Sequence, residues 1–150
     1  MSDTQKRPGQ GYRKLYAFEA AHDLVKVMYE LTNGFPRTQE FGLKSQMRRA
    51  AVSVAANIVE GHALDTAALF ARHLAISFGS CKELEYYFQL TCELGYLKPA
   101  DAERAARLEG RAAFLIGRLL NGVRKRIGMK VSEPHEEYSL DSLDSEMEPT

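Results

Sequence analysis

LKSQMRRAAVSVAANIVEG, residues 43–61, is the stretch that indicates how the rest of the chain is organised. At about 100° per residue, a helix here carries an apolar stripe that consists of Leu43, Met47, Ala51, Val54 and Ile58. A polar stripe runs beside it and consists of Gln46, Arg49, Ser53, Asn57 and Glu60. The remaining face is again mostly apolar, whereas a surface helix shows a polar face as wide as its apolar one. We therefore expect a helix that is buried on both sides and whose polar stripe needs protein partners.

Three further segments repeat the helical spacing of apolar residues. They cover about residues 15–32, 66–95 and 99–127. Asp65-Thr66 is the expected N-cap of the third helix, Gly61 is the expected stop of the second, and Gly79 in mid-helix predicts a close helix–helix approach. No segment alternates like a strand. Residues 12–128 are therefore predicted to form an all-α, antiparallel up-and-down four-helix bundle.

The two ends of the chain differ from this middle part in composition. Residues 1–11 are polar and are expected to form a flexible basic N-terminal arm. Residues 129–150 carry seven acidic side chains against one lysine, a net charge of −6, whereas the remainder of the chain carries +6. Such a composition without periodicity predicts a disordered acidic C-terminal tail. This tail either screens basic residues of the bundle or only keeps the protein in solution.

The sequence lacks the features of a membrane or secreted protein. It contains no run of about 18 apolar residues, and residues 1–10 include no apolar segment of a secretory signal. Cys81 and Cys92 lie eleven residues apart in one predicted helix, about 16 Å along its axis, so they cannot form a disulfide within the chain. We expect a cytoplasmic protein with two reduced, buried thiols and no contact with a membrane.

Searches for catalytic and metal-binding patterns find no match. His22, His62, His73 and His135 are scattered, and no two have the i, i+4 spacing of a helical metal site. The sequence has no phosphate-binding glycine loop, no nucleophile elbow and no Cys-x-x-Cys motif. We expect a protein that is not an enzyme and that holds no cofactor or metal.

The polar stripe of residues 43–61 needs acidic partners on the third helix. Glu83 and Glu85 are suitable, and Glu85 falls among the apolar positions of that helix. We therefore predict that Arg48 or Arg49 pairs with Glu83 or Glu85 in a buried polar network. Such a network fixes the register of the helices, and the alternative is a ligand-binding role.

A second pattern lies on the fourth helix, where five basic residues share one face. They are spaced 3, 4, 7 and 7 residues apart, and we call them the basic stripe: Arg104, Arg107, Arg111, Arg118 and Lys125. Arg13 and Lys14 add basic charge near the N-terminus. Arginines along one helix are typical of a phosphate-binding surface, and a solvated or interface face is the alternative. We place no aromatic side chain on this face, so the pattern does not predict base stacking.

Residues 41–61, 70–85 and 94–97 resemble the four-helix-bundle family encoded in intervening sequences of bacterial 23S rRNA genes, and the resemblance covers about residues 12–126. The resemblance rests on a Gln-x-Arg-Arg-Ala…Ser…Asn-Ile-x-Glu-Gly motif and on its continuation in the third helix: Gln46, Arg48, Arg49, Ser53, Asn57, Glu60, Gly61, Gly79, Ser80 and Glu83. It implies a bundle that assembles into a ring-shaped homopentamer. The chain is more distantly similar to the accessory variability protein of diversity-generating retroelements, a basic pentamer that associates with reverse transcriptase and nucleic acid. The resemblance carries over no catalytic residue.

Apolar side chains on the outer faces of the second and third helices have no place in the core of a single bundle. We call them the apolar patch and predict that further copies of the chain cover them: Val52, Ala56, Val59, Leu69, Ile76 and Tyr87. The sequence thus predicts a non-enzymatic homo-oligomer, a pentamer by resemblance, that associates with RNA or DNA through the basic stripe. A protein partner such as a reverse transcriptase would fit this role. The alternative is a protein–protein scaffold or adaptor ring without direct nucleic-acid contact.

Overall fold

The structure is a computed structural model that describes residues 11–128. Within this range the chain forms four α-helices, α1 (Tyr16–Thr32), α2 (Leu43–Ala63), α3 (Ala67–Glu93) and α4 (Pro99–Arg126). Two short 3-10 helices precede α1 and α2, namely η1 (Gly11–Lys14) and η2 (Arg37–Gln39). The prediction of an all-α four-helix bundle is confirmed. The predicted basic arm (1–11), except Gly11 in η1, and the predicted acidic tail (129–150) lie outside the described residues.

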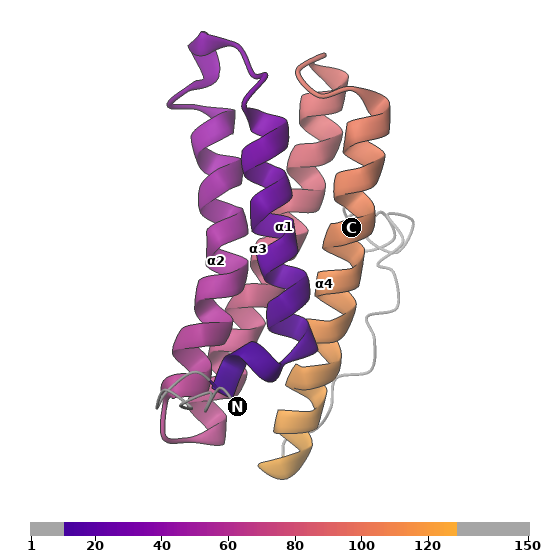
Figure 1. The fold of residues 1–150 in the computed structure, drawn as a ribbon. Coiled ribbons are helices and arrows are strands. Elements are labelled where there is room, and N and C mark those ends of the chain that lie inside the picture. Colours follow the sequence, from indigo (N-terminus) through magenta and orange to yellow (C-terminus); the bar gives the residue numbers. More distant parts are fainter. Residues whose placement is uncertain (1–10, 129–150) are drawn as a thin grey trace, which may run out of the picture.

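The four helices stand in a square, and each runs antiparallel to its neighbours (Figure 1). α1 and α3 each pack against both α2 and α4, whereas the backbones of the diagonal pairs α1/α3 and α2/α4 stay apart. The α1–α2 connection and the α3–α4 turn lie at one end of the bundle (Figure 1). The start of α1, the α2–α3 turn and the end of α4 lie at the other end. α2 and α4 therefore occupy opposite corners.

The core lies along the axis of this square and receives side chains from all four helices. The largest fully buried apolar side chains are Leu24, Met28, Met47, Ile58, Leu74, Leu84 and Ile116. Each of them stabilises the fold by roughly 1.5–3 kcal/mol through removal of apolar surface from water. Four of the five residues in the predicted apolar stripe of α2 are buried, and Leu43 is half-buried. No helix within residues 11–128 combines the length and the apolar character needed to cross a membrane.

Of three predictions about single residues in the helices, the structure confirms one and corrects two. The hydroxyl of Thr66 accepts a hydrogen bond from the Leu69 N–H at 3.2 Å, so Thr66 is the N-cap of α3 as predicted. Gly61 does not stop α2, which continues to Ala63. A Cβ at position 61 would lie 2.7 Å from Cβ of His73, so Gly61 is the site of close approach between α2 and α3. Gly79 has no such neighbour within 4 Å, and the close approach predicted there is wrong for the single bundle.

Candidate functional site

Arg49 and Glu83 form the ion pair that the sequence predicted between α2 and α3. Nη2 of Arg49 lies 2.8 Å from Oε1 of Glu83, and its Nε donates to Oε1 of Gln46 at 3.1 Å. The hydroxyl of Tyr87 donates to the same oxygen of Glu83 at 3.0 Å. The side chains of the pair are 59% and 34% exposed, so the predicted burial of this pair is wrong for the single chain.

Below this pair, a line of polar side chains continues along the contact between α2 and α3. The hydroxyls of Ser53 and Ser80 are 2.9 Å apart, and Nδ2 of Asn57 donates to the Ser53 carbonyl at 2.9 Å. Oδ1 of Asn57 lies 3.0 Å from Nδ1 of His73, and Oε2 of Glu60 lies 3.8 Å from the same nitrogen. We call the Arg49–Glu83 pair and this line the polar seam. Because its members bond mainly to one another, the seam fixes the register of α2 against α3.

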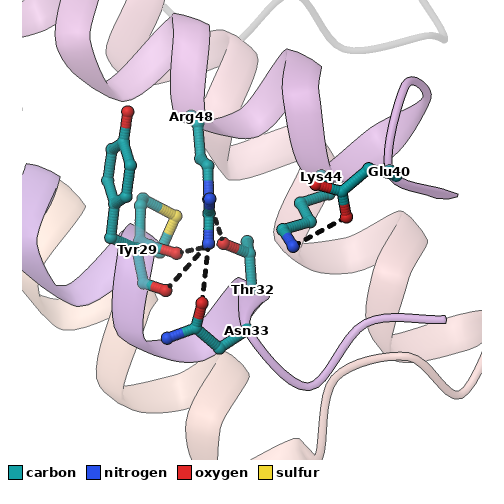
Figure 2. A network of polar contacts seen from close by, with 7 residues as sticks. Tyr29, Thr32, Asn33, Glu40, Lys44 and Arg48 are labelled. Atoms are coloured by element: carbon teal, nitrogen blue, oxygen red, sulfur yellow. Dashed lines mark hydrogen bonds and ion pairs between the residues drawn. The ribbon is translucent and has the colours of Figure 1, made fainter. Parts of the chain in front are cut away.

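Arg48 makes a different set of contacts from the one predicted (Figure 2). Its guanidinium donates to the Thr32 hydroxyl at 2.8 Å, to Oδ1 of Asn33 at 2.9 Å and to the Tyr29 carbonyl at 3.2 Å. It also lies 4.4 Å from the centroid of the Tyr29 ring. The last carbonyls of a helix have no partner within the helix, and a cation is favourable at that end. Arg48 therefore closes the end of α1 and ties it to α2, and does not pair with Glu83.

A second charged group in Figure 2 stabilises the start of α2. Nζ of Lys44 lies 2.8 Å from Oε2 of Glu40, and the hydrogen bond from this ammonium holds the pKa of Glu40 below its usual value. Both groups lie beside the α1–α2 connection. These contacts, like those of Arg48, position the helices at this end of the bundle.

The buried carboxylate of the bundle is Glu109 on α4, which the sequence reasoning missed. Glu109 is 3% exposed, and its Oε1 has no hydrogen-bond partner among the described residues. Lys82 Nζ lies 3.9 Å away and is shared with Glu85 at 3.0 Å. Glu85 is exposed, so its predicted core position and its pairing with Arg48 or Arg49 are wrong. The spacing of Glu109, four residues after Ala105 on the inward face of α4, was the signal that could have revealed it.

Burial raises the pKa of the Glu109 carboxyl above that of an ordinary glutamate, and the Lys82 ammonium opposes this shift. Burial also raises the pKa of the nearby Cys81 thiol to about 12, and the charge of Glu109 adds to that shift. A thiol with such a pKa is not a nucleophile at neutral pH. Cys81 and Cys92 are both free, but only Cys81 is buried as predicted, and Cys92 is half-buried. Within the described part of the chain, acidic, His and Cys side chains form no group of three that could hold a metal ion.

The apolar patch is partly open in the single bundle. Val52, Leu69 and Ile76 are exposed, and Ile76 retains 46% of its accessible surface. Its other members, Ala56, Val59 and Tyr87, are half-buried. The sequence predicted that α2 is buried on both sides. Within one chain, its second face is not buried. Since the polar seam lies beside the patch, both belong to the outer side of the α2–α3 pair.

All five residues of the basic stripe are exposed on α4. Arg104 donates to both carboxylate oxygens of Glu30 on α1, at 3.2 and 3.4 Å. Within residues 11–128, the side chains of Arg107, Arg111 and Lys125 have no hydrogen bond or ion pair. The contact with Glu30 places the start of the stripe on the side of α4 that faces α1.

Phe114 lies within the basic stripe. The prediction that this face carries no aromatic side chain is therefore wrong. Phe114 follows Arg111 by three residues and precedes Arg118 by four, the spacing that places helical residues side by side. Its side chain is 63% exposed, and the guanidinium of Arg118 lies 5.8 Å from the ring centroid. Helical spacing alone was sufficient to find this residue.

Arg13 and Lys14 lie in η1 at the end of the bundle where α4 also ends (Figure 1). η1 packs against α1 and α2 and makes no backbone contact with α4. Arg13 lines a shallow hollow with Phe18, Glu19 and His22. The structure therefore does not bring the two N-terminal basic residues onto the basic stripe.

Comparison with known families identifies the chain. Residues 13–116, more than half of the sequence, match the family described as 23S rRNA-intervening sequence protein. The chain belongs to this family. The matched range contains the whole polar seam and the whole apolar patch. It also contains Phe114 and the first three members of the basic stripe, whereas Arg118 and Lys125 lie beyond it.

A solved structure from Bacteroides thetaiotaomicron shares the fold of this chain. That structure is described as a protein with unknown function from the S23 ribosomal protein family. It is 20% identical, superimposes with a TM-score of 0.65, and aligns over 69% of this chain and 97% of its own. At this identity the likeness shows the fold alone. No curated protein matches the chain.

Proposed function

We propose that this protein is a non-enzymatic, self-associating helical bundle that binds nucleic acid, structured RNA in the first place, through the basic stripe. The observation that supports nucleic-acid binding is the set of exposed cations on α4 for which the described residues supply no acidic partner, namely Arg107, Arg111 and Lys125. A guanidinium grips a phosphate through two parallel hydrogen bonds. From Arg104 to Lys125 the stripe extends about 32 Å, which allows contact with several phosphates of one strand.

Self-association is supported by the apolar patch. Val52, Leu69 and Ile76 are exposed apolar side chains on two adjacent helices, and exposed apolar surface of this kind normally marks an interface. A copy of the same chain would also cover the exposed Arg49–Glu83 pair. Five subunits is the number that the family resemblance suggests.

Light scattering tests self-association. The chain has a mass of 16.8 kDa, and we expect a multiple of that mass at micromolar concentration. Ile76→Glu should reduce the mass to that of one chain, because a charge would be buried in the subunit contact. Phe41→Glu is the matched control, since Phe41 is an exposed apolar residue outside the patch. A single-chain mass for the unchanged protein would overturn this part of the proposal.

Binding of RNA as a function of salt tests the role of the basic stripe. We expect affinity to fall steeply as salt rises, since each phosphate contact releases counterions. Replacing Arg107, Arg111 and Lys125 together by glutamine should lower the slope of log K against log salt by about 2. The control replaces three exposed cations that lie off the stripe by glutamine: Arg37, Arg72 and Lys98. Equal losses in the two variants would mean that the stripe has no special role.

A scaffold or adaptor ring that binds only proteins, such as a reverse transcriptase, is the second candidate. The Arg104–Glu30 pair favours it, because that pair removes one cation from the stripe. Residues 129–150, with their net charge of −6, lie outside the described residues, and their screening of the stripe stays a prediction. If a variant without these residues also fails to bind RNA at about 50 mM salt, the scaffold is favoured. Tighter binding of that variant at low salt alone would support screening by the tail.

A further inference from the structure

Phe114 is an exposed aromatic side chain that the fold does not use. A buried phenylalanine stabilises a core, yet this ring keeps 63% of its surface open to solvent. It is the one aromatic residue of α4, and it stands in line with Arg111 and Arg118. The Arg118 guanidinium at 5.8 Å is within the range of a cation–π contact. The ring is thus held beside cations at the surface and not folded inward.

The surroundings of this ring leave space for a flat ligand. Its neighbours along the helix on the side away from the arginines are Gly110, four residues before it, and Gly117, three residues after it. A Cβ at position 110 would meet no atom within 4 Å, so tight packing does not explain that glycine. Glycine within a helix is less favourable than alanine. A Cβ at position 117 would meet the Phe78 ring at 3.8 Å, so the open space beside Phe114 lies on the Gly110 side.

We propose that Phe114 is a stacking platform for an unpaired nucleobase, with Arg111 and Arg118 binding the phosphates on either side of it. This inference rests on the proposed nucleic-acid role of the basic stripe and narrows it to unpaired segments. Every nucleobase has an apolar face that stacks on an aromatic ring, and cations beside the ring bind the strand that carries the base. In a duplex those faces are already stacked on neighbouring bases, so the ring would bind single strands and loops and not continuous helices.

Substitution of Phe114 by leucine separates stacking from charge. Leucine keeps an apolar side chain and a strong helix propensity, but it has no flat ring. We expect Phe114→Leu to bind an unpaired oligoadenylate RNA about 5- to 100-fold more weakly than the unchanged protein. Binding of a blunt RNA duplex should change by less than about twofold, and the salt dependence should be unchanged because no cation is lost. Phe41→Leu, at an exposed phenylalanine away from α4, is the matched control.

Substitution of Phe114 by tryptophan observes the contact directly. The chain contains no tryptophan, so Phe114→Trp introduces a single fluorophore at this position. Its emission should be quenched when unpaired RNA is added and not when duplex is added, while Phe41→Trp should respond to neither. Repeating the titration with unpaired DNA shows whether the sugar matters. Equal quenching by both would assign the site to single strands in general, and quenching by RNA alone would assign it to RNA.

The possible results are distinguishable. Binding of unpaired RNA by Phe114→Leu as tight as that of the unchanged protein would overturn the stacking platform but leave the basic stripe as a binding surface. Failure of the unchanged protein to bind any nucleic acid at about 50 mM salt would overturn both. A change in assembly mass on Phe114→Leu substitution would assign the ring to a subunit contact and would also overturn the proposal.

Discussion

Substitution of Arg48 by methionine should lower the free energy of unfolding by about 2–3 kcal/mol. The guanidinium makes one part-buried hydrogen bond to Thr32 and two exposed ones at the end of α1 (Figure 2). A part-buried bond from a charged donor contributes about 1.5 kcal/mol, and each exposed bond roughly 0.5 kcal/mol. Methionine retains a long aliphatic side chain but loses the donors and the cation beside the Tyr29 ring, a contact of about 0.5 kcal/mol at an exposed site. The expected loss is therefore the energy of these bonds and of this contact.

Substitution of Thr32 by valine isolates the most buried of these bonds. Oγ1 of Thr32 accepts from Arg48 and donates to the Met28 carbonyl at 2.6 Å. Valine has a similar shape without the hydroxyl. In a double-mutant cycle, the two effects should fall short of additivity by about 1–1.5 kcal/mol, the energy of the bond they share. Arg48→Lys keeps the charge without the planar guanidinium and should recover less than half of the loss.

Urea unfolding followed by circular dichroism measures these energies. All variants are compared at one protein concentration, because self-association would shift apparent stability by mass action. Arg37→Met, at an exposed arginine of η2, is the control and should change the free energy by less than about 0.5 kcal/mol. Full additivity of Arg48→Met and Thr32→Val would refute the reasoning. Unchanged stability of Arg48→Met together with weaker RNA binding would instead make Arg48 a nucleic-acid contact.

Three further predictions concern other contacts and use the same unfolding assay. Arg49→Ala should lower the free energy of unfolding by at most about 1 kcal/mol in dilute protein, because its pair with Glu83 lies at the surface. A loss that grows with protein concentration would place the pair in a subunit contact. Gly61→Ala should lower the free energy of unfolding by about 1–3 kcal/mol, because the added methyl group overpacks α2 against α3. Gly79→Ala should raise it by about 0.5–1 kcal/mol, because no atom lies within 4 Å of the added Cβ. The opposite order would contradict the packing. Glu109→Gln should be more stable than the unchanged protein by about 1 kcal/mol near pH 7. That difference should vanish at about pH 4, because a raised pKa in the folded state lowers stability only as the pH rises above the ordinary pKa of glutamate. Parallel pH profiles of the two proteins would contradict the buried charge.

The architecture could be predicted from the sequence because its signals are local. Apolar spacing within 43–61 and the cap at Thr66 depend on residues a few positions apart, and the structure follows both. The two glycines show where local signals fail. Gly61 looked like a helix stop and is a packing position, while Gly79 looked like a packing position and is open. Both are glycines in helices, and only the neighbouring helix decides which of them needs to lack a side chain.

The charged residues could be predicted only in part, for a related reason. Helical spacing places side chains around an axis but does not say which arc faces the core. Glu85 and Glu109 both stood next to apolar positions, and packing buried only Glu109. The Arg49–Glu83 pair was predicted because two complementary motif residues lay on adjacent helices. The partners of Arg48 were not predicted, because they lie at the end of α1. The sequence does not reveal where that end lies relative to α2.

The two proposed interfaces lie on opposite sides of the square of helices and need not compete. The Arg49–Glu83 pair marks the α2–α3 side, beside the apolar patch, and the Arg104–Glu30 pair marks the α1–α4 side, where the basic stripe begins. A subunit contact over the patch would therefore leave the stripe and Phe114 open on every copy. An assembly would then present several identical strips of cations and rings to one long strand. Each added contact on a tethered strand benefits from an effective concentration in the millimolar range. Weak binding by a single bundle would thus be sufficient for strong binding by the assembly. The two parts of the proposed function are linked because the apolar patch and the basic stripe lie on opposite sides of the bundle.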